Sequence, residues 1–409
     1  MNMTKKLIIV TFCMVCLLPI STQSQPNTVE NYWNYHDLIR KAEIAFYLNN
    51  DVDSCLYYYN QAFNIFSFNY VHDLVNAAQI AYFSKKDYKP FVYKGLHYGL
   101  KSSHLKQIPL LTEIIQEIED FEKTSEYKTV RHNYLSRLDF DYLSWIYDLG
   151  IDDQINKVES DYDIYTLNYI NELIPKIKQN GFPSNRRIGI EDSTIFSEIG
   201  KPEFDLIRRV EKHHDYFWKK EVSPDSKFTI IPNTKQNSSG EEPMQISFGE
   251  EPVEVSFGNN TAITFSFVET SPAGYYFKTD DDILSNRFIM VLLHHRGCSY
   301  SELKDMMLEE ITKGNFHPRE FGFVYDRQCE AAMEIWNPMR ENCPQLIKED
   351  GVFRIGNILS FSEFEKTPHD KVNALRTKYN IVPLEVDNMK KRLEKDYGFK
   401  LFWGFWDCL

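Results

Sequence analysis

The sequence predicts a mainly α-helical protein, in which helical hairpins are followed by a helical domain with a small inserted β meander. Apolar residues recur at the spacing of an amphipathic helix along most of the 409 residues. One segment, residues 224–280, instead alternates apolar and polar residues after glycine-containing turns, as strands do. Hydrophobic residues at 43% and charged residues at 26% are typical of a chain that folds and exclude a disordered one.

The net charge excludes one class of partner. The 46 basic and 59 acidic residues leave a formal charge of −13, so the chain as a whole has no general attraction to nucleic acid or anionic lipid. We therefore expect no nucleic acid partner. A protein or a peptide is the partner class that remains.

Residues 1–25 have the layout of a secretory signal peptide: a basic pair, the apolar residues 7–20 and a short polar end. This layout predicts export to the periplasm or to the outside of the cell. The apolar run is shorter than the ~20 residues that a membrane-spanning helix needs, and we expect no membrane span elsewhere. Lipid anchoring, the alternative, is disfavoured because bulky residues precede Cys13 and Cys16.

Removal of residues 1–25 would leave five cysteines, which are too sparse for a disulfide scaffold. None belongs to a Cys-x-x-Cys pair, which excludes a zinc ribbon and a thioredoxin-like motif. Cys329 and Cys343 form the most plausible bridge, and buried free thiols are the alternative. The five are Cys55, Cys298, Cys329, Cys343 and Cys408.

The segment 26–105 repeats itself. Residues 42–47 return at 78–83, an offset of 36 positions, and residues 57–62 are echoed at 92–97. Small alanines in the repeated segments let two helices approach closely, while large rings fill the grooves between them. This pattern predicts paired helices.

The period and composition of this segment resemble those of tetratricopeptide-type helix hairpins, over about two units. Polar turns at 50–51 and 86–87 separate the paired helices, and Pro90 falls in a first helical turn, where proline is tolerated. Gly95 departs from the pattern, which prefers alanine there. The resemblance implies a concave polar face that binds a peptide or a neighbouring domain. Packing of that face against the rest of the same chain is the alternative.

Residues 106–223 form the first part of the predicted helical domain. An apolar stripe runs over residues 111–118, and residues 127–149 continue at helical spacing until the glycine that follows them. A third helix contains Pro175, which is expected to kink or break it, and ends at Gly181.

The insertion, residues 224–280, contains a nine-residue tandem repeat, residues 240–248 followed by residues 249–257. Each copy pairs a glycine-containing turn with an alternating, β-prone run, so we expect a small antiparallel meander. A surface loop lengthened by duplication is the alternative, because Pro243 and Pro252 weaken a central strand.

Residues 281–409 form the second part of the helical domain. Residues 283–295 are apolar nearly all round and predict a buried helix. Ser299 begins another helix that ends at Gly314, and Pro318 begins the next one.

Four motifs occur in order over residues 150–395: Asp-Gln-x-x-Lys at 153–157, Gly-Phe-Pro at 181–183, His-His at 294–295 and Asp-Arg at 326–327. Together they resemble the Asp-Gln-x-x-Arg, Gly-x-Pro, His-helix and Asp-Arg elements of an uncharacterised bacterial domain-of-unknown-function family. The lysine of the first motif replaces an arginine. The resemblance implies a helical domain and carries no activity.

The same positions form the candidate site. A histidine and an aspartate beside a guanidinium hold a proton-transfer pair or bind a small anion, and a buried ion-pair network is the alternative. Adjacent histidines on a helix diverge by about 100°, so they do not share one ion, and no metal and no cofactor are expected. The candidates are His294, Asp326, Arg327 and Asp153 for catalysis, and Gln154 and His295 for ligand binding.

Two functions remain. The chain contains no Gly-x-Ser-x-Gly, P-loop, Gly-x-Gly-x-x-Gly or His-Glu-x-x-His motif, so the sequence favours an exported binding or scaffold protein that works through its helical repeats. A hydrolase-like or small-anion-binding helical domain is the alternative. The substrate, the partner and the oligomeric state stay open.

Overall fold

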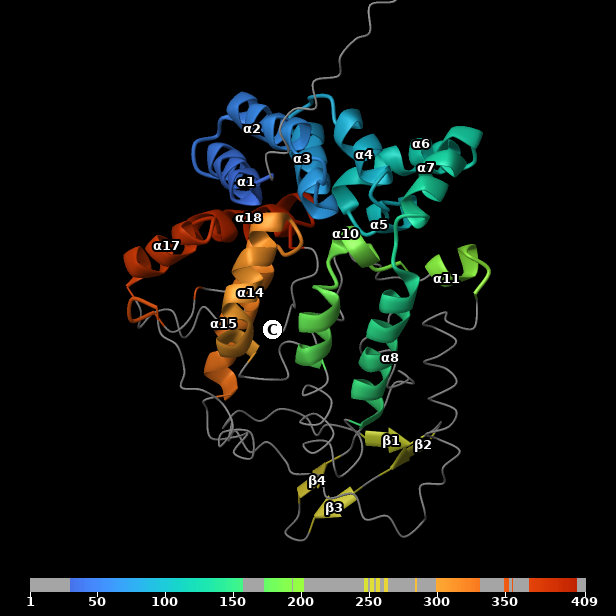
Figure 1. The fold of residues 1–409 in the computed structure, drawn as a ribbon, viewed down its shortest axis with the longest axis vertical. Coiled ribbons are helices and arrows are strands. Elements are labelled where there is room, and N and C mark those ends of the chain that lie inside the picture. The colour runs from blue at the N-terminus through green and yellow to red at the C-terminus, as the bar shows by residue number, and fades with distance from the viewer. Residues whose placement is uncertain are drawn as a thin grey trace, which may run out of the picture. The chain divides into compact units, whose positions relative to one another are not determined.

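The fold is mainly helical, as the sequence predicts (Figure 1). In the part of the chain that the computed structural model describes, no helix is both long enough and apolar enough to cross a membrane. The predicted signal segment and nearly all of the predicted helix 283–295 lie outside this part. The described residues are 30–156, 173–192, 194–201, 246–248, 251–253, 255–257, 261–263, 284, 299–331, 349–352, 355 and 368–402.

Two helical hairpins open the described chain, α1 (Tyr32–Tyr47) with α2 (Val52–Ile65), and α3 (Val71–Phe83) with α4 (Lys89–Leu96). The Asn31 side chain accepts a hydrogen bond from the Trp33 N–H at the start of α1, and Asp51 caps α2 in the same way. Both hairpin turns contain a residue in the left-handed region, Asn50 with φ 53° and Lys85 with φ 57°. These turns lie at the predicted places, while the relation to tetratricopeptide hairpins stays a prediction.

Several short elements and a longer helix follow in the described chain. Asp139 begins the longer helix, because its carboxylate accepts from the Tyr142 N–H. We predicted one helix over residues 127–149, and this is wrong: α7 ends at Leu135 and α8 continues through Gly150, since one interior glycine weakens a helix by only about 1 kcal/mol. The elements are α5 (Ser102–Leu105), the 3₁₀ helix η1 (Pro109–Ile114), α6 (Ile115–Glu122), α7 (Ser125–Leu135), α8 (Phe140–Asn156), α10 (Asn185–Ile188) and α11 (Ile195–Glu198).

Residues 173–180 are also helical, with Pro175 near the start of the described stretch. This helix ends at Gly181, whose φ is 84°, as predicted. The residues before 173 lie outside the described chain, so the effect of Pro175 stays a prediction.

The described residues of the insertion form the short strands β1 (Ile246–Phe248), β2 (Glu251–Val253), β3 (Val255–Phe257) and β4 (Thr261–Ile263). They pair antiparallel as β1 with β2 and β3 with β4. Among the described strands these are two separate two-stranded sheets, so a continuous meander is not shown.

The later helices are α14 (Ser299–Lys313), α15 (Pro318–Ala331), α17 (His369–Lys378) and α18 (Leu384–Tyr397). The predicted starts of α14 and α15 are confirmed, and Gly314, with φ 78°, follows the last residue of α14. Both α14 and α18 contact α1.

Two apolar cores lie inside the described chain. The first is built by the hairpins and η1 to α7, and it includes Val382, Val386 and Leu401 from the end of the chain. The second joins α8, residues 173–196, α14, α15 and α17. The first core therefore combines residues that are far apart in the sequence. The predicted domain limits themselves stay a prediction.

Gly314 provides a test of the junction between α14 and α1. A Cβ atom there would lie 2.7 Å from ring atoms of Tyr32, whose hydroxyl is fixed by the backbone of Phe68. We expect Gly314→Ala to lower the free energy of unfolding by about 3 kcal/mol, through overpacking added to backbone strain.

The control is Gly200→Ala. Gly200 has a similar φ of 73°, but a Cβ there meets no atom within 4 Å, so only the strain of about 1 kcal/mol applies. Urea unfolding followed by circular dichroism compares the two variants. Equal losses would show that the Tyr32 contact contributes nothing.

Candidate functional site

A polar stripe on α1 recurs on α3. His36, Arg40 and Glu43 are followed, each after 36 positions, by His72, Asn76 and Gln79. Spacings of four and seven place each set on one side of its helix. We call these six residues together with Asp73 the polar face.

Much of the polar face is buried against later parts of the same chain. Glu43 accepts a hydrogen bond from the Lys390 ammonium group of α18, and both side chains are almost fully buried. Gln79 makes two hydrogen bonds with the backbone of Lys400: its Nε2 donates to the carbonyl oxygen at 2.8 Å, and its Oε1 accepts from the N–H at 2.7 Å. In this structure the polar face therefore packs against later parts of the same chain, which is the alternative given in the sequence analysis.

A small cavity of ≈ 20 Å³ lies at the polar face. Its walls come from α1 and α3, from His317 and Arg319 at the start of α15, and from residues 380–382 and Leu401. A volume of this size holds about one water molecule or one ion. The cavity is therefore too small for an organic substrate.

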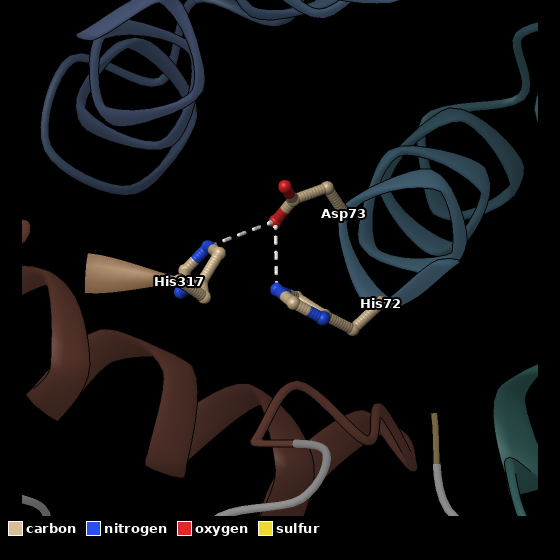
Figure 2. A group of neighbouring side chains, drawn as sticks. All are labelled: His72, Asp73 and His317. Carbon is tan, nitrogen blue, oxygen red and sulfur yellow. Dashed lines mark ion pairs between the residues drawn. The ribbon is translucent and has the colours of Figure 1, made fainter. Parts of the chain in front are cut away.

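Three histidines and one aspartate meet at this cavity, and we call His36, His72, Asp73 and His317 the histidine centre. The Oδ1 atom of Asp73 lies 3.3 Å from Nε2 of His72 and 3.9 Å from Nε2 of His317 (Figure 2). The ring centroid of His317 lies 4.9 Å from that of His36 and 4.5 Å from that of His72. The Tyr35 hydroxyl donates to the other carboxylate oxygen of Asp73 at 2.9 Å.

His317 is held by the first turn of α15. The Arg319 N–H donates to its Nδ1 at 3.1 Å, and its own N–H donates to the Glu320 carboxylate at 3.0 Å. This arrangement resembles a capping box, but the His317 side chain accepts from the second helical residue instead of the third. The Nε2 atom of the ring is thereby left facing Asp73.

Several polar atoms of this region have no hydrogen-bond partner among the described protein atoms. They are both ring nitrogens of His36 and of His72, Nε2 of His317 and Oδ1 of Asn76. A buried polar atom that stays unsatisfied costs about 1–3 kcal/mol. The concentration of such atoms around one cavity marks it as a place that favours a small polar occupant.

The burial of the histidine centre controls its charges. Burial lowers the pKa of His36 to about 3, and although Asp73 opposes this shift, the nearby His72 adds to it. Burial also lowers the pKa of His317, with contributions from His72 and His36. Burial alone would raise the pKa of Asp73, but the neighbouring His72 and the Tyr35 hydroxyl bring it below its usual value. At neutral pH the centre therefore contains an aspartate anion beside neutral His36 and His317.

A second charged cluster lies next to the centre. Asp387 of α18 binds both Arg319 and Arg376, and these arginines lower its pKa to about 2 against the effect of burial. Arg376 also donates to the carbonyl oxygen of Ile355 at 2.8 Å. The Asp387 cluster fixes α15, α17 and α18 to one another.

The structure describes only some of the candidates chosen from the sequence. Asp326 is buried, and its carboxylate accepts from the Ile355 N–H at 2.6 Å, so it holds the backbone near residue 355. Asp153 and Gln154 lie in α8 and Arg327 lies in α15, without described side chains, while His294 and His295 lie outside the described residues. The convergence of these candidates stays a prediction.

Among the cysteines, Cys55 is buried and has a free thiol, whose pKa is raised by burial. The side chains of the other four lie outside the described part, so the bridge between Cys329 and Cys343 stays a prediction.

The sequence analysis did not single out the histidine centre. The return of His36 as His72 after one repeat was a visible signal, because buried and equivalent positions of a repeat share their surroundings. His317 gave no such signal, because only the fold brings it to α3.

Comparison of the chain with protein-family models, curated proteins and solved structures found no match. The resemblances drawn from the sequence motifs stay predictions.

The neutral histidines predict an acid-sensitive fold. Unfolded His36 titrates near pH 6.5, whereas the folded residue stays neutral down to about pH 3, so the unfolded state binds more protons in this range. The free energy of unfolding should therefore fall as the pH drops below 6.5, by about 2 kcal/mol at pH 5 from this residue. Asp73, His72 and His317 face the same ring and stay unchanged in the test.

Urea unfolding at pH 7 and pH 5, in buffer with EDTA, measures this effect. His36→Gln should reduce the loss between the two pH values, while the same substitution at the exposed His132 should not. An unchanged loss in the His36 variant would contradict the assignment.

Proposed function

We propose that this chain is an exported, non-enzymatic binding protein whose hairpins use the polar face to hold a helix and the extended segment after it. The observation that carries this proposal is the pair of hydrogen bonds between Gln79 and the backbone of Lys400. In the isolated chain the occupant is its own segment, residues 384–402.

The contacts on the polar face are of the kind that recognise peptides. Gln79 bonds to a main-chain N–H and C=O, so this contact gives affinity for an extended segment whatever its side chain. Glu43, one repeat earlier, instead requires a cation, which Lys390 supplies from α18. Backbone contacts and one charge requirement together provide affinity and selectivity.

The two hairpins use equivalent positions of the repeated stripe to contact the same segment. Glu43 and Gln79 occupy equivalent positions of the two hairpins, and each contacts residues 390–400. This agrees with the concave polar face that tetratricopeptide-type hairpins imply. The layout of residues 1–25 supports the part of the proposal that the protein is exported.

Hydrogen exchange tests the Gln79 contact in the whole protein. Gln79→Leu keeps the size of the side chain and removes both hydrogen bonds, each worth about 1 kcal/mol. The Lys400 N–H, which donates to Gln79 Oε1, should then exchange about tenfold faster or more.

The matched control is Gln116→Leu, which replaces an exposed glutamine bonded to Asp120. It should leave exchange at Lys400 unchanged. Equal protection of Lys400 in all three proteins would show that Gln79 does not hold the segment.

Binding in trans tests the function itself. We expect a labelled peptide of residues 384–402 to bind the full-length Lys390→Ala variant more tightly than the unmodified chain, since only the peptide then supplies a cation to the buried Glu43. Adding Gln79→Leu to that variant should weaken the binding. Fluorescence anisotropy measures both, and equally weak binding to all three folded chains would reject the proposed function.

A further inference from the structure

Three potential ligand atoms for one metal ion converge at the histidine centre. They come from His72, Asp73 and His317, and all lie within 4.8 Å of one another (Figure 2). His72 and Asp73 are adjacent in α3, and their side chains nevertheless bring Nε2 and Oδ1 to 3.3 Å from each other. Two imidazole nitrogens and a carboxylate oxygen are a donor set that suits zinc and related divalent ions. An ion about 2.1 Å from each ligand keeps tetrahedral ligand atoms about 3.4 Å apart. The distances of 3.3 Å and 3.9 Å to Asp73 Oδ1 are close to this spacing.

The cavity beside these atoms matches one ion. Its ≈ 20 Å³ leave no room for an organic substrate, and its walls include all three residues. His36 lines the same cavity, and both of its ring nitrogens are without a protein partner in the described chain. The space and the ring nitrogens therefore point to a small resident occupant.

Two arginines line the cavity, Arg40 and Arg319, and they form ion pairs with Asp37 and Asp387 rather than with Asp73. Asp73 is buried, and within the described residues its ion-pair partners are the two histidines rather than a lysine or an arginine. The neighbouring carboxylates already have cationic partners: Glu43 pairs with Lys390, and Asp387 pairs with Arg319 and Arg376. Asp73 is thus the carboxylate of this region that a bound cation would stabilise.

We propose that His72, Asp73 and His317 bind one divalent transition-metal ion of the zinc class. For Nε2 of His317 to bind the ion, the ring proton moves from Nε2 to Nδ1, and the hydrogen bond from the Arg319 N–H to Nδ1 is lost on binding. His36 offers a further nitrogen at the same cavity.

This site goes beyond the proposed peptide-binding role. Two of its ligands belong to α3 of the second hairpin, and the third begins α15. The ion joins the predicted hairpin domain, residues 26–105, to the second part of the helical domain. Binding should therefore stabilise the packing between these segments, since an ion that binds only the folded state raises its stability.

The test uses tag-free protein, first treated with EDTA and then titrated with Zn²⁺. We expect calorimetry and elemental analysis after gel filtration to give one Zn²⁺ per chain, and Zn²⁺ to raise the melting temperature. His72→Ala and Asp73→Asn should each weaken the affinity for Zn²⁺ by about tenfold or more. Replacing a residue that only hydrogen-bonds to a metal ligand already weakens metal affinity by about tenfold, and these substitutions remove a ligand itself. Co²⁺ should give the visible absorption of a site with nitrogen and oxygen ligands.

His132→Ala is the matched control, since His132 is exposed and lies outside the cavity. It should bind Zn²⁺ like the unmodified chain. Asp73→Asn retains the size of the side chain, and its circular dichroism shows whether it folds. Absence of stoichiometric binding to the folded protein, or equal affinity in the folded Asp73 variant, would overturn the proposal. Either result leaves the peptide test of the polar face unaffected.

Discussion

The structure depends on one constraint: the polar side chains buried on α1 and α3 need partners. All residues from Val71 to Ala81 of α3 are buried, including His72, Asp73, Asn76 and Gln79. Such a helix is unstable by itself, because each buried polar group without a partner opposes folding. Contacts from α18, from residues 398–402 and from the start of α15 meet part of this need.

The partners on the polar face differ in what they contribute. The Glu43–Lys390 pair is buried, and desolvation offsets much of the attraction between its two charges. Its main effect is to reject other arrangements, because an unpaired Glu43 would be far less favourable than the pair. The Gln79 contact is neutral, so it adds stability without a comparable desolvation cost.

Local signals in the sequence were enough to locate many elements. The polar turn at 50–51 separates α1 from α2, and Gly314 followed by Pro318 separates α14 from α15. The break between α7 and α8 was missed, because it depends on Asp139, whose N–H bonds to the distant Arg187 carbonyl.

The candidate site was less accessible to sequence reasoning. Motif order directed attention to Asp326, whose described role is to hold a backbone amide. His72 and Asp73 look like an ordinary polar pair in a helix, and their significance comes from His317, which only tertiary structure adds. Chemistry that depends on distant residues leaves little trace in local patterns, apart from the recurrence of the stripe itself.

The contacts of Trp33 have a consequence for the order of folding. Its carbonyl accepts from Asn380, its indole N–H donates to Thr312, and the nearby first core takes in Leu401. These contacts span most of the chain, and loops of this length close slowly. During synthesis the hairpins emerge from the ribosome long before residues 380–401, and they stay incompletely packed until those residues arrive. The first core of this chain can therefore be completed only after residues 380–401 have been made.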